Sequence, residues 1–575
     1  MSPQDTPPIH ITPETGIKHF LLIIYGGKSK NMSQDPNIEV IDVAIIGGGP
    51  GGTYAGWRLK TGYVDRDTRL SQFMSDNGGN LRVRLYEGSD RIGGRLESLI
   101  PPGAPHLRAE FGGMGYSSNH IVVKQLVENV LKLPIVDFPA GTDQNINYLR
   151  GVFYRLIDYQ KNPSIVPYRV RPTEYGKDFS EIILQAVQTV IPNVTTLEWY
   201  QWQYLKQNML FEGRHLYDMG FWNFLQRLMS NEAYNLSVDA GGHFPFIGNW
   251  NAAEALEWYM SDFKPNTTYK TVSTGYDQIP LTLFNQYVAA GGEFRMSTKL
   301  TGIQKMNVPP YGDVFYLTFS QGDPVLARAV ILSMPRRSLE IISPNSDILR
   351  DATTQALIST VTPSPVMKIF LTYAYPWWTN VGVNSGRSVT DLPVRVVYYM
   401  GTENQQGGDP NNTNSLLMAS YNDDRFITFW EGLRKGVPYS GASNPFVQGN
   451  AQDFWKQQDA TVAMVAELQR ELLQMHQLDY IPMPYSAAFK DWSDDPYGGA
   501  WNTWNVGVKA WEVMKQIIQP DPTSPLFICG SAYSQWQGWV EGALETAENV
   551  MWRGLGMSRP SWLPEYNTFM PQLLP

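Results

Sequence analysis

The sequence predicts an α/β fold whose main domain is assembled from separated segments of the chain. At one end, the apolar run Ile41–Ile46 leads directly into a glycine-rich turn and a segment of small residues. At the other end, the apolar run Leu526–Cys529 is followed by a small-residue helix that begins near Gly538. Each unit is a buried strand followed by a helix, a pattern typical of sheets covered by helices. We therefore expect segments from both ends of the chain to form one domain.

The glycine-rich turn has the form G-x-G-x-x-G, with Gly47, Gly49 and Gly52 at the fixed positions. After a strand and before a helix, this spacing predicts a Rossmann-type dinucleotide-binding turn. The first glycine permits the tight turn, the second lets the backbone approach a pyrophosphate, and the third lets the helix lie close to the strand. The helix N-terminus then faces the anion. The alternative interpretation is a tight turn that binds no ligand.

An acid-ended strand and an arginine-rich loop follow the turn. The run 81–87 alternates in the manner of a strand and ends in Glu87, the candidate acceptor for a ribose hydroxyl. The polar stretch 61–80 before it indicates an insertion between the helix and the strand. The next segment, 91–98, has two glycines between Arg91 and Arg95. Such a loop is suited to wrap a second face of a pyrophosphate, and a bare surface loop is the alternative.

The arginine and glycine segment, directly after the acid-ended strand, resembles the R-x-G-G-R segment of the flavin-containing amine oxidase family. The residues from Gly538 to Ala547 resemble the family's last cofactor motif, in which a helix start faces the flavin pyrimidine. The resemblance covers residues 40 to 555 and implies that the cofactor is FAD rather than NAD. The FAD contacts it implies are Gly47, Gly49, Gly52, Glu87, Gly94, Arg95, Gly112, Gly113, Leu300, Gly530, Ser531, Trp539 and Val540. The family usually has glutamate where this chain has Ser531.

Lys368 is a lysine inside an apolar run, 366–373, that is predicted to be a strand. An unpaired ammonium group in such a place is costly, so a buried lysine needs a specific partner. The segment resembles the family strand whose lysine holds a water beside flavin N5, which makes Lys368 the candidate catalytic residue. The alternative is a lysine at a strand end with its charged head in solvent.

The segments 386–393 and 418–421 resemble the L-amino-acid oxidase branch of the family. By this resemblance, Tyr421 hydrogen-bonds a substrate carboxylate, although an aromatic on a half-buried strand is an equally good structural interpretation. The candidate substrate-binding residues are Met114, Tyr421, Gly538 and Trp539. At Gly115 the branch usually has an arginine that clamps the carboxylate with two parallel donors. The carboxylate is then held by another cation, held by neutral donors, or absent from the substrate.

The motifs divide the chain into an amine oxidase-like α/β architecture with three parts. A Rossmann-type FAD-binding domain is assembled from the separated segments 40–116, 270–345 and 506–575, the last including a C-terminal tail. The segment 117–269 is predicted to be a mainly helical lid domain, because its apolar residues recur with a helical period. The segment 346–505 is predicted to be a substrate-binding domain with a mixed sheet, and residues 1–39 are an N-terminal extension.

Composition excludes several classes of protein. The 575 residues carry a formal net charge of -9 and no long basic run, which argues against a nucleic-acid partner. The seven histidines have no metal-ligand spacing, so no metal is predicted, and His243 receives no functional assignment. A single cysteine excludes an intramolecular disulfide. The run Phe20–Tyr25 is too short to span a membrane, no signal peptide is recognised, and a cytoplasmic location is predicted.

The predicted function is the FAD-dependent oxidative deamination of L-amino acids to 2-oxo acids, ammonia and hydrogen peroxide. The predicted partners are a small amino acid or amine substrate and molecular oxygen, with a homodimer possible. A monoamine or polyamine oxidase of the same fold is an alternative, favoured by the missing arginine at Gly115. A flavin-binding protein without turnover is a second alternative, and the lysine in its apolar strand argues against it. An NAD-linked dehydrogenase gives no role to the segment 91–95 or to the helix near Gly538.

Overall fold

The computed structural model describes residues 38–65, 68–138, 141–244, 248–264, 266–447 and 453–566. All but the last two residues of the predicted N-terminal extension, 1–39, lie outside these ranges, and so does the run Phe20–Tyr25. Within them, no helix has the length and apolar character needed to cross a membrane.

A seven-stranded sheet, here called sheet I, collects strands from both ends of the chain. β1 lies between β2 and β15 and is parallel to both, and β12 and β23 extend the parallel part at either side. β14 and β13 follow as an antiparallel meander on β15. The strands are β1 (Val40–Ile46), β2 (Val83–Tyr86), β12 (Glu293–Arg295), β13 (Leu300–Val308), β14 (Gly312–Phe319), β15 (Val325–Ser333) and β23 (Leu526–Cys529). The predicted pairing of the two chain ends in one sheet is confirmed.

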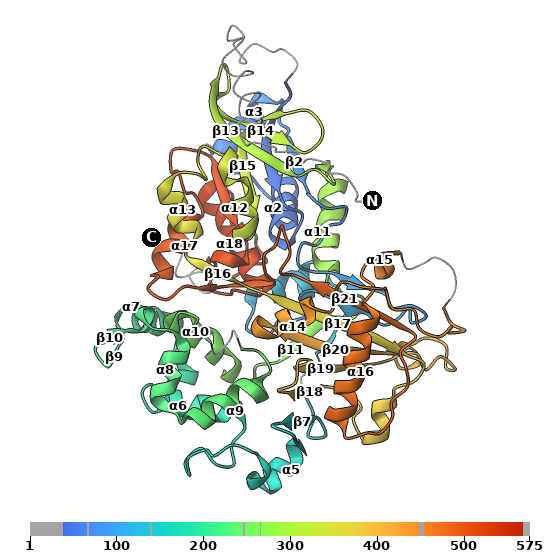
Figure 1. The fold of residues 1–575 in the computed structure, drawn as a ribbon. Helices are drawn as coiled ribbons and strands as arrows, with labels where there is room; N and C mark the ends of the chain where they lie inside the picture. Colours follow the sequence, from blue (N-terminus) through green and yellow to red (C-terminus); the bar gives the residue numbers. More distant parts are fainter. Residues whose placement is uncertain are drawn as a thin grey trace, which may run out of the picture.

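Three helices from distant segments pack together beside sheet I (Figure 1). They are α2 (Pro50–Thr61), α11 (Gln278–Ala289) and α18 (Val540–Asn549). α2 is buried from residue 51 to residue 59, which explains why its first two turns consist largely of small residues. The insertion predicted at 61–80 contains α3 (Arg69–Asp76), which Thr68 caps. Further helices of this part are α12 (Arg336–Ile342), α13 (Ala352–Ile358) and α17 (Ala510–Ile517).

A second seven-stranded sheet, sheet II, has the order β21-β17-β20-β19-β18-β7-β8. Its strands are β21 (Ser486–Asp491), β17 (Val366–Tyr373), β20 (Ser415–Asp423), β19 (Val396–Thr402), β18 (Arg387–Thr390), β7 (Ile146–Leu149) and β8 (Val152–Arg155). Alternate residues of β17, Met367, Ile369 and Leu371, belong to one core with apolar residues of α16 (Val462–His476). Because side chains alternate across a strand, Lys368 and Phe370 face the other side.

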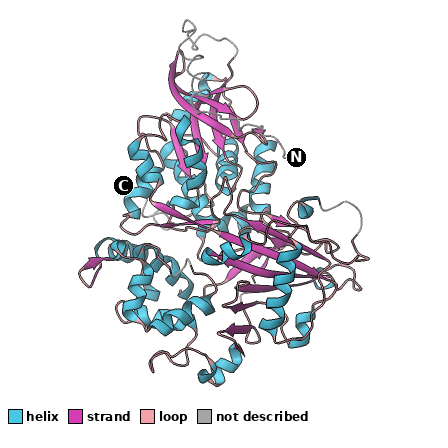
Figure 2. Ribbon diagram, viewed as in Figure 1, coloured by secondary structure: helices cyan, strands magenta, loops and turns pink. Residues whose placement is uncertain are grey.

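The chain segment 179–260 contains α6 (Phe179–Gln188), α7 (Trp199–Asn208), α8 (Phe221–Leu228), α9 (Asn231–Gly241) and α10 (Ala252–Met260). Figure 2 shows these helices gathered opposite sheet II. The segment 117–269, predicted to be mainly helical, also contains short strands, of which β7 and β8 at 146–155 join sheet II. β7 pairs in parallel with β18, Asn147 lying opposite Val389. Strands of four residues are too short for their pattern to stand out from the surrounding helices.

Four shorter groups of strands and some short helices complete the described fold. The strands are β3 (Ser98–Leu99), β4 (Ala109–Glu110), β5 (Tyr116–Ser117), β6 (Ile135–Asp137), β9 (Leu210–Phe211), β10 (Arg214–His215), β11 (Tyr269–Val272), β16 (Val361–Ser364) and β22 (Trp501–Trp504). The helices are α4 (Ile121–Lys124), α5 (Leu156–Lys161), α14 (Ile427–Glu431) and α15 (Asp453–Lys456). α4 continues as a π-helix over Gln125–Val130, within the run predicted to be helical.

Candidate active site

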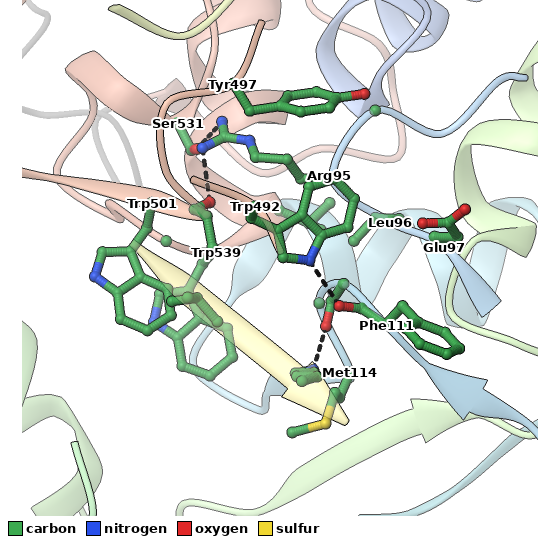
Figure 3. Close-up of a pocket in the computed structure, with 18 of the residues that line it drawn as sticks. Arg95, Leu96, Glu97, Phe111, Met114, Trp492, Tyr497, Trp501, Ser531 and Trp539 are labelled. Atoms are coloured by element: carbon green, nitrogen blue, oxygen red, sulfur yellow. Dashed lines mark hydrogen bonds between the residues drawn. The ribbon is translucent and has the colours of Figure 1, made fainter. Parts of the chain in front are cut away.

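One cavity of about 1700 Å³ extends from the glycine-rich turn of sheet I to the inner face of sheet II. This volume exceeds the several hundred Å³ typical of a small-molecule pocket, so it offers room for a dinucleotide together with a substrate. Its wall contains every predicted site residue except Gly52. Figure 3 shows part of this wall, where indole rings of Trp492, Trp501 and Trp539 lie near Arg95 and Ser531.

The glycine-rich turn forms one end of the cavity. Gly47 has φ +108°, and a Cβ there would lie 2.5 Å from the carbonyl oxygen of Ser333. Gly52 lies behind the wall, where a Cβ would come within 1.9 Å of the Gly47 carbonyl oxygen. Both positions therefore exclude a side chain and hold α2 close to the sheet. No side chain caps the N-terminus of α2, so its first amide groups are available to an anion in the cavity.

Glu87 closes the wall of the same end, immediately after β2. One carboxylate oxygen accepts a hydrogen bond of 2.6 Å from the Gly48 amide. The other accepts bonds of 2.7 Å from the amide and the hydroxyl of Ser89. A carboxylate offers about four acceptor positions, so one remains for a hydroxyl group of a ligand. The position is consistent with the predicted ribose contact.

The two arginines of the segment 91–95 have different surroundings. Arg91 binds its own loop, since it donates to the carbonyl oxygens of Leu96 and Gly94 and lies 3.4 Å from the Glu97 carboxylate. Arg95 instead donates to the Ala500 carbonyl oxygen at 2.7 Å and to the Ser531 hydroxyl at 3.3 Å. Burial lowers the pKa of Arg95 to about 10, and no carboxylate of the described chain lies within ion-pair distance of it. A ligand anion would supply the missing counter-charge.

The C-terminal motif lies on the same cavity. Gly530, with φ +138°, follows β23. The hydroxyl of the next residue, Ser531, accepts a hydrogen bond from Arg95, at the position where the family usually has glutamate. Gly538, Trp539 and Val540 line the cavity at the start of α18, which also lacks a side-chain cap. The exposed amides of this helix start can face an electron-rich group. Leu300, at the start of β13, also lines the cavity, and Thr298 just before it donates its amide to the Glu87 carbonyl oxygen.

Lys368 lies at the opposite end, on the cavity face of β17, and is 2% exposed. Its ammonium group donates to the carbonyl oxygens of Glu110, at 3.0 Å, and of Gly112. Burial lowers the pKa of Lys368 to about 7, against the attraction of the Glu110 carboxylate. Burial likewise raises the pKa of Glu110 to about 7. The alternative of a lysine with its head in solvent is therefore wrong.

Tyr421 is the neighbour of Lys368 on β20, and the ammonium nitrogen lies 4.6 Å from the centroid of its ring. His243 lies on the other side, with ring centroids 4.4 Å apart. The Nδ1 atom of His243 is 2.8 Å from a carboxylate oxygen of Asp423. Burial lowers the pKa of His243 more than Asp423 raises it, which favours the neutral imidazole. Four side chains from three segments thus gather at this end of the cavity.

The backbone beside Gly115 explains why no arginine stands at this position. A Cβ at this position would lie 2.6 Å from the carbonyl oxygen of Lys270, because β5 and β11 pair directly beside it. No side chain fits there without moving β11. Met114, the residue before it, lines the cavity as predicted.

A comparison with known protein families places these observations in context. Residues 70–550 match the model of the flavin containing amine oxidoreductases. The chain belongs to this family.

The chain is also similar to several named proteins. Achacin of Lissachatina fulica is 25% identical over 89% of this chain and 92% of its own length. Aplysianin-A of Aplysia kurodai is 23% identical over 89% of this chain and 90% of its own length. A putative L-amino-acid oxidase of Bacillus subtilis, YobN, is 22% identical over 84% of this chain and 91% of its own length. A solved structure of putrescine oxidase with bound putrescine superposes with a TM-score of 0.59 at 17% identity, over 89% of this chain and 99% of that chain.

Membership of the flavin containing amine oxidoreductases implies a flavin cofactor. The described residues fit such a group, because the cavity is long, two uncapped helix starts face it, and Arg95 has no carboxylate partner. Among the residues that the structure describes, no group of three or more histidine, cysteine and acidic side chains could hold a metal ion. The absence of a metal, and the individual roles of the site residues, stay predictions.

Sequence reasoning missed two kinds of residue in this amine oxidoreductase. His243 received no function, and its partner Asp423 is 180 positions away, so no local pattern joins them. Arg387, within the segment 386–393, received no function either, yet it lines the cavity. The available signal was its place on an alternating run, which puts it on the same face as Val389.

Proposed function

We propose that this chain is an FAD-dependent oxidase that deaminates L-amino acids to 2-oxo acids, ammonia and hydrogen peroxide. The observation that carries the proposal is the buried Lys368 beside the half-buried Tyr421, at the far end of a cavity that begins at the glycine-rich turn. The names of several relatives support an amino acid as the substrate. One of them is L-amino-acid oxidase of Bungarus fasciatus, which is 23% identical over 56% of this chain.

FAD is the flavin that best suits the cavity, because the dinucleotide needs two separate anchors. The amides of α2 and the guanidinium of Arg95 would hold the pyrophosphate, and Glu87 would accept a ribose hydroxyl. The start of α18 at Val540 would face the ring system. When bound, the flavin supplies the two-electron chemistry, taking a hydride from the carbon next to the amine and passing the electrons to oxygen.

The protein side chains orient the substrate and keep water away. The hydroxyl of Tyr421 would donate to the substrate carboxylate, since burial raises its pKa and keeps it protonated. The ammonium or amine of Lys368, held by two carbonyl oxygens, would hold a water at a fixed place. Trp501 and Trp539 line the same cavity and make its wall apolar. Met114 and Gly538 would complete the substrate contacts.

A monoamine or polyamine oxidase is the second candidate. It is favoured by Gly115, where the backbone of β11 excludes the arginine that usually clamps a carboxylate. A flavin-binding protein without turnover gives no reason for burying Lys368 beside the cavity. A homodimer and a cytoplasmic location stay predictions from the sequence.

We expect purified protein to be yellow and to release FAD on denaturation, and to form peroxide with L-amino acids. The measurement is the absorbance and chromatographic identity of the released flavin, followed by a peroxide assay over the amino acids and simple amines. Folded, colourless protein that cannot take up FAD would contradict the cofactor. A preference for phenylethylamine or a polyamine over every amino acid would replace the proposed substrate class by the second candidate.

Replacing Tyr421 by phenylalanine is expected to raise the KM for an L-amino acid about 10- to 100-fold. This matches the loss of one hydrogen bond to a charged group, about 1.5 to 3 kcal/mol, while activity on the decarboxylated amine stays nearly unchanged. Tyr316→Phe, on β14 of sheet I and outside the cavity wall, is the matched control. Equal effects of Tyr421→Phe on the acid and the amine would assign Tyr421 a packing role only.

A further inference from the structure

Arg387 lies at the first position of β18, on the face of sheet II that borders the cavity. It pairs with Tyr398 of β19, and both side chains line the cavity together with Val389. The strand order from β17 to β18 places two strands between Lys368 and Arg387. At about 4.8 Å per strand, the two backbones are about 14 Å apart. The lysine and the arginine therefore lie on one continuous floor beneath the substrate end of the cavity.

The guanidinium of Arg387 makes few interactions with the protein. It donates a hydrogen bond of 3.3 Å to the Gly241 carbonyl oxygen, at the end of α9. Its central carbon is 6.0 Å from the ring centroid of Phe179. Over the described ranges, no carboxylate lies within 4 Å of it, although a guanidinium has five donors that match a carboxylate pairwise.

The charged neighbours of Arg387 do not neutralise it. Asp262 is nearby, and burial raises the pKa of its carboxyl to about 6 despite the attraction of Arg387. The Asp262 carboxylate instead accepts a hydrogen bond from the Tyr269 hydroxyl. His243 also faces the arginine, and the positive charge of Arg387 helps to keep the imidazole neutral. Lys177 and Asp178 line the cavity as well.

The other arginines that line the cavity, and Lys490, interact with other groups of the protein. Arg91 and Lys490 both pair with Glu97. Arg95 lies at the cofactor end, between Ala500 and Ser531. Arg387 is thus a guanidinium at the substrate end whose donors face the cavity without a carboxylate partner in the described part of the chain.

We propose that Arg387 binds a carboxylate of the substrate and so replaces the arginine that cannot exist at Gly115. This rests on the proposed amino-acid oxidase function, because a carboxylate brought into a largely apolar cavity is costly without a cationic partner. The carboxylate has two possible sources. It is either the α-carboxylate that Tyr421 also contacts, or the side-chain carboxylate of an acidic amino acid that extends along sheet II toward β18.

The test compares Arg387→Met and Arg387→Lys with the wild-type holoenzyme. Peroxide formation is measured with L-leucine, L-glutamate and phenylethylamine, and the Kd of benzoate, which cannot be oxidised, is measured from the change in flavin absorbance. If Arg387 binds the α-carboxylate, Arg387→Met raises KM for both amino acids and the benzoate Kd at least tenfold, and leaves phenylethylamine unchanged. If it binds a side-chain carboxylate, only the KM for L-glutamate rises. Arg387→Lys restores part of the loss, since it returns the charge without the paired donors.

Arg227→Met is the control, because Arg227 is an arginine on α8 that is 64% exposed and does not line the cavity. Flavin content and thermal unfolding of every variant separate a folding defect from a binding defect. An unchanged benzoate Kd together with unchanged KM values for both amino acids in Arg387→Met overturns the proposal while the amino-acid oxidase function stands. A wild-type enzyme that oxidises amines and no amino acid overturns both, and that result is visible before any variant is made.

Discussion

Replacing Gly52 by alanine is expected to abolish flavin binding or to unfold the first βα unit. The added Cβ would lie 1.9 Å from the Gly47 carbonyl oxygen and 3.3 Å from the Ser333 side chain. The nearest atom belongs to the backbone between β1 and α2, so relief requires α2 to move away from sheet I. Overpacking usually costs 1 to 3 kcal/mol, and a backbone clash at the cofactor turn should reach at least about 3 kcal/mol. This corresponds to a loss of at least about 100-fold in flavin affinity or in the folded fraction.

Helix propensity cannot explain such a loss, because alanine is favoured over glycine inside a helix by about 1 kcal/mol. The measurement is the flavin content of purified Gly52→Ala and its thermal unfolding. Gly436→Ala is the control, since the nearest atom to its added Cβ lies 3.9 Å away. A variant with full flavin content and unchanged stability would refute the role of Gly52 in bringing α2 against the strand.

Replacing Lys368 by methionine is expected to retain the flavin and to slow turnover or flavin reoxidation at least tenfold, about 1.4 kcal/mol. The reason is that methionine keeps the buried volume but cannot hold a water at the position between β17 and the segment 110–112. Steady-state peroxide kinetics and stopped-flow reoxidation measure the effect. Lys515→Met, an exposed lysine on α17, is the control. Unchanged rates would leave Lys368 with a structural role.

The same substitution is expected to have a larger effect on the free energy of unfolding. The lowered pKa of Lys368 fixes the sign of this effect. The pKa of Lys368 falls from its ordinary value of 10.5 to about 7 in the folded protein. Between these values the unfolded chain binds the proton and the folded one does not, so stability rises with pH across this window. Burying the lysine is therefore most costly below pH 7, by about 5 kcal/mol, and the cost disappears near pH 10.5.

Denaturant unfolding of the flavin-free proteins between pH 6 and pH 10.5 checks this. The stability difference between Lys368→Met and wild type should favour the variant most at low pH and decline by up to about 5 kcal/mol as the pH rises. Because Lys368 lowers the pKa of Glu110, the substitution also changes the titration of that carboxyl, and Glu110→Gln in both proteins removes this contribution. Lost hydrogen bonds to the Glu110 and Gly112 carbonyl oxygens shift the whole curve without changing its slope. A difference that does not vary with pH would refute the lowered pKa.

Short, contiguous patterns determined the parts of the fold that the sequence alone predicts. The strand and glycine turn at 41–52, the arginine loop at 91–95 and the helix start near Gly538 each act within one element. A glycine spacing or an apolar run reports local backbone geometry directly, so its meaning does not depend on distant residues. The same holds for Lys368, whose apolar strand predicted burial before any partner was known.

Only the tertiary structure decided which distant groups meet. It joined Arg95 to Ser531 across 436 positions and His243 to Asp423 across 180. It also placed 146–155 at the edge of sheet II rather than in a helix, because strand pairing with β18 outweighs the helical pattern around it. The exclusion of a side chain at Gly115 likewise depends on β11, which lies beside it. The position of Arg387 on the cavity wall depends on sheet II. The sequence predicted a dinucleotide-binding turn through local backbone rules and a flavin through its resemblance to a family, whereas the substrate end depends on long-range packing that no single segment encodes.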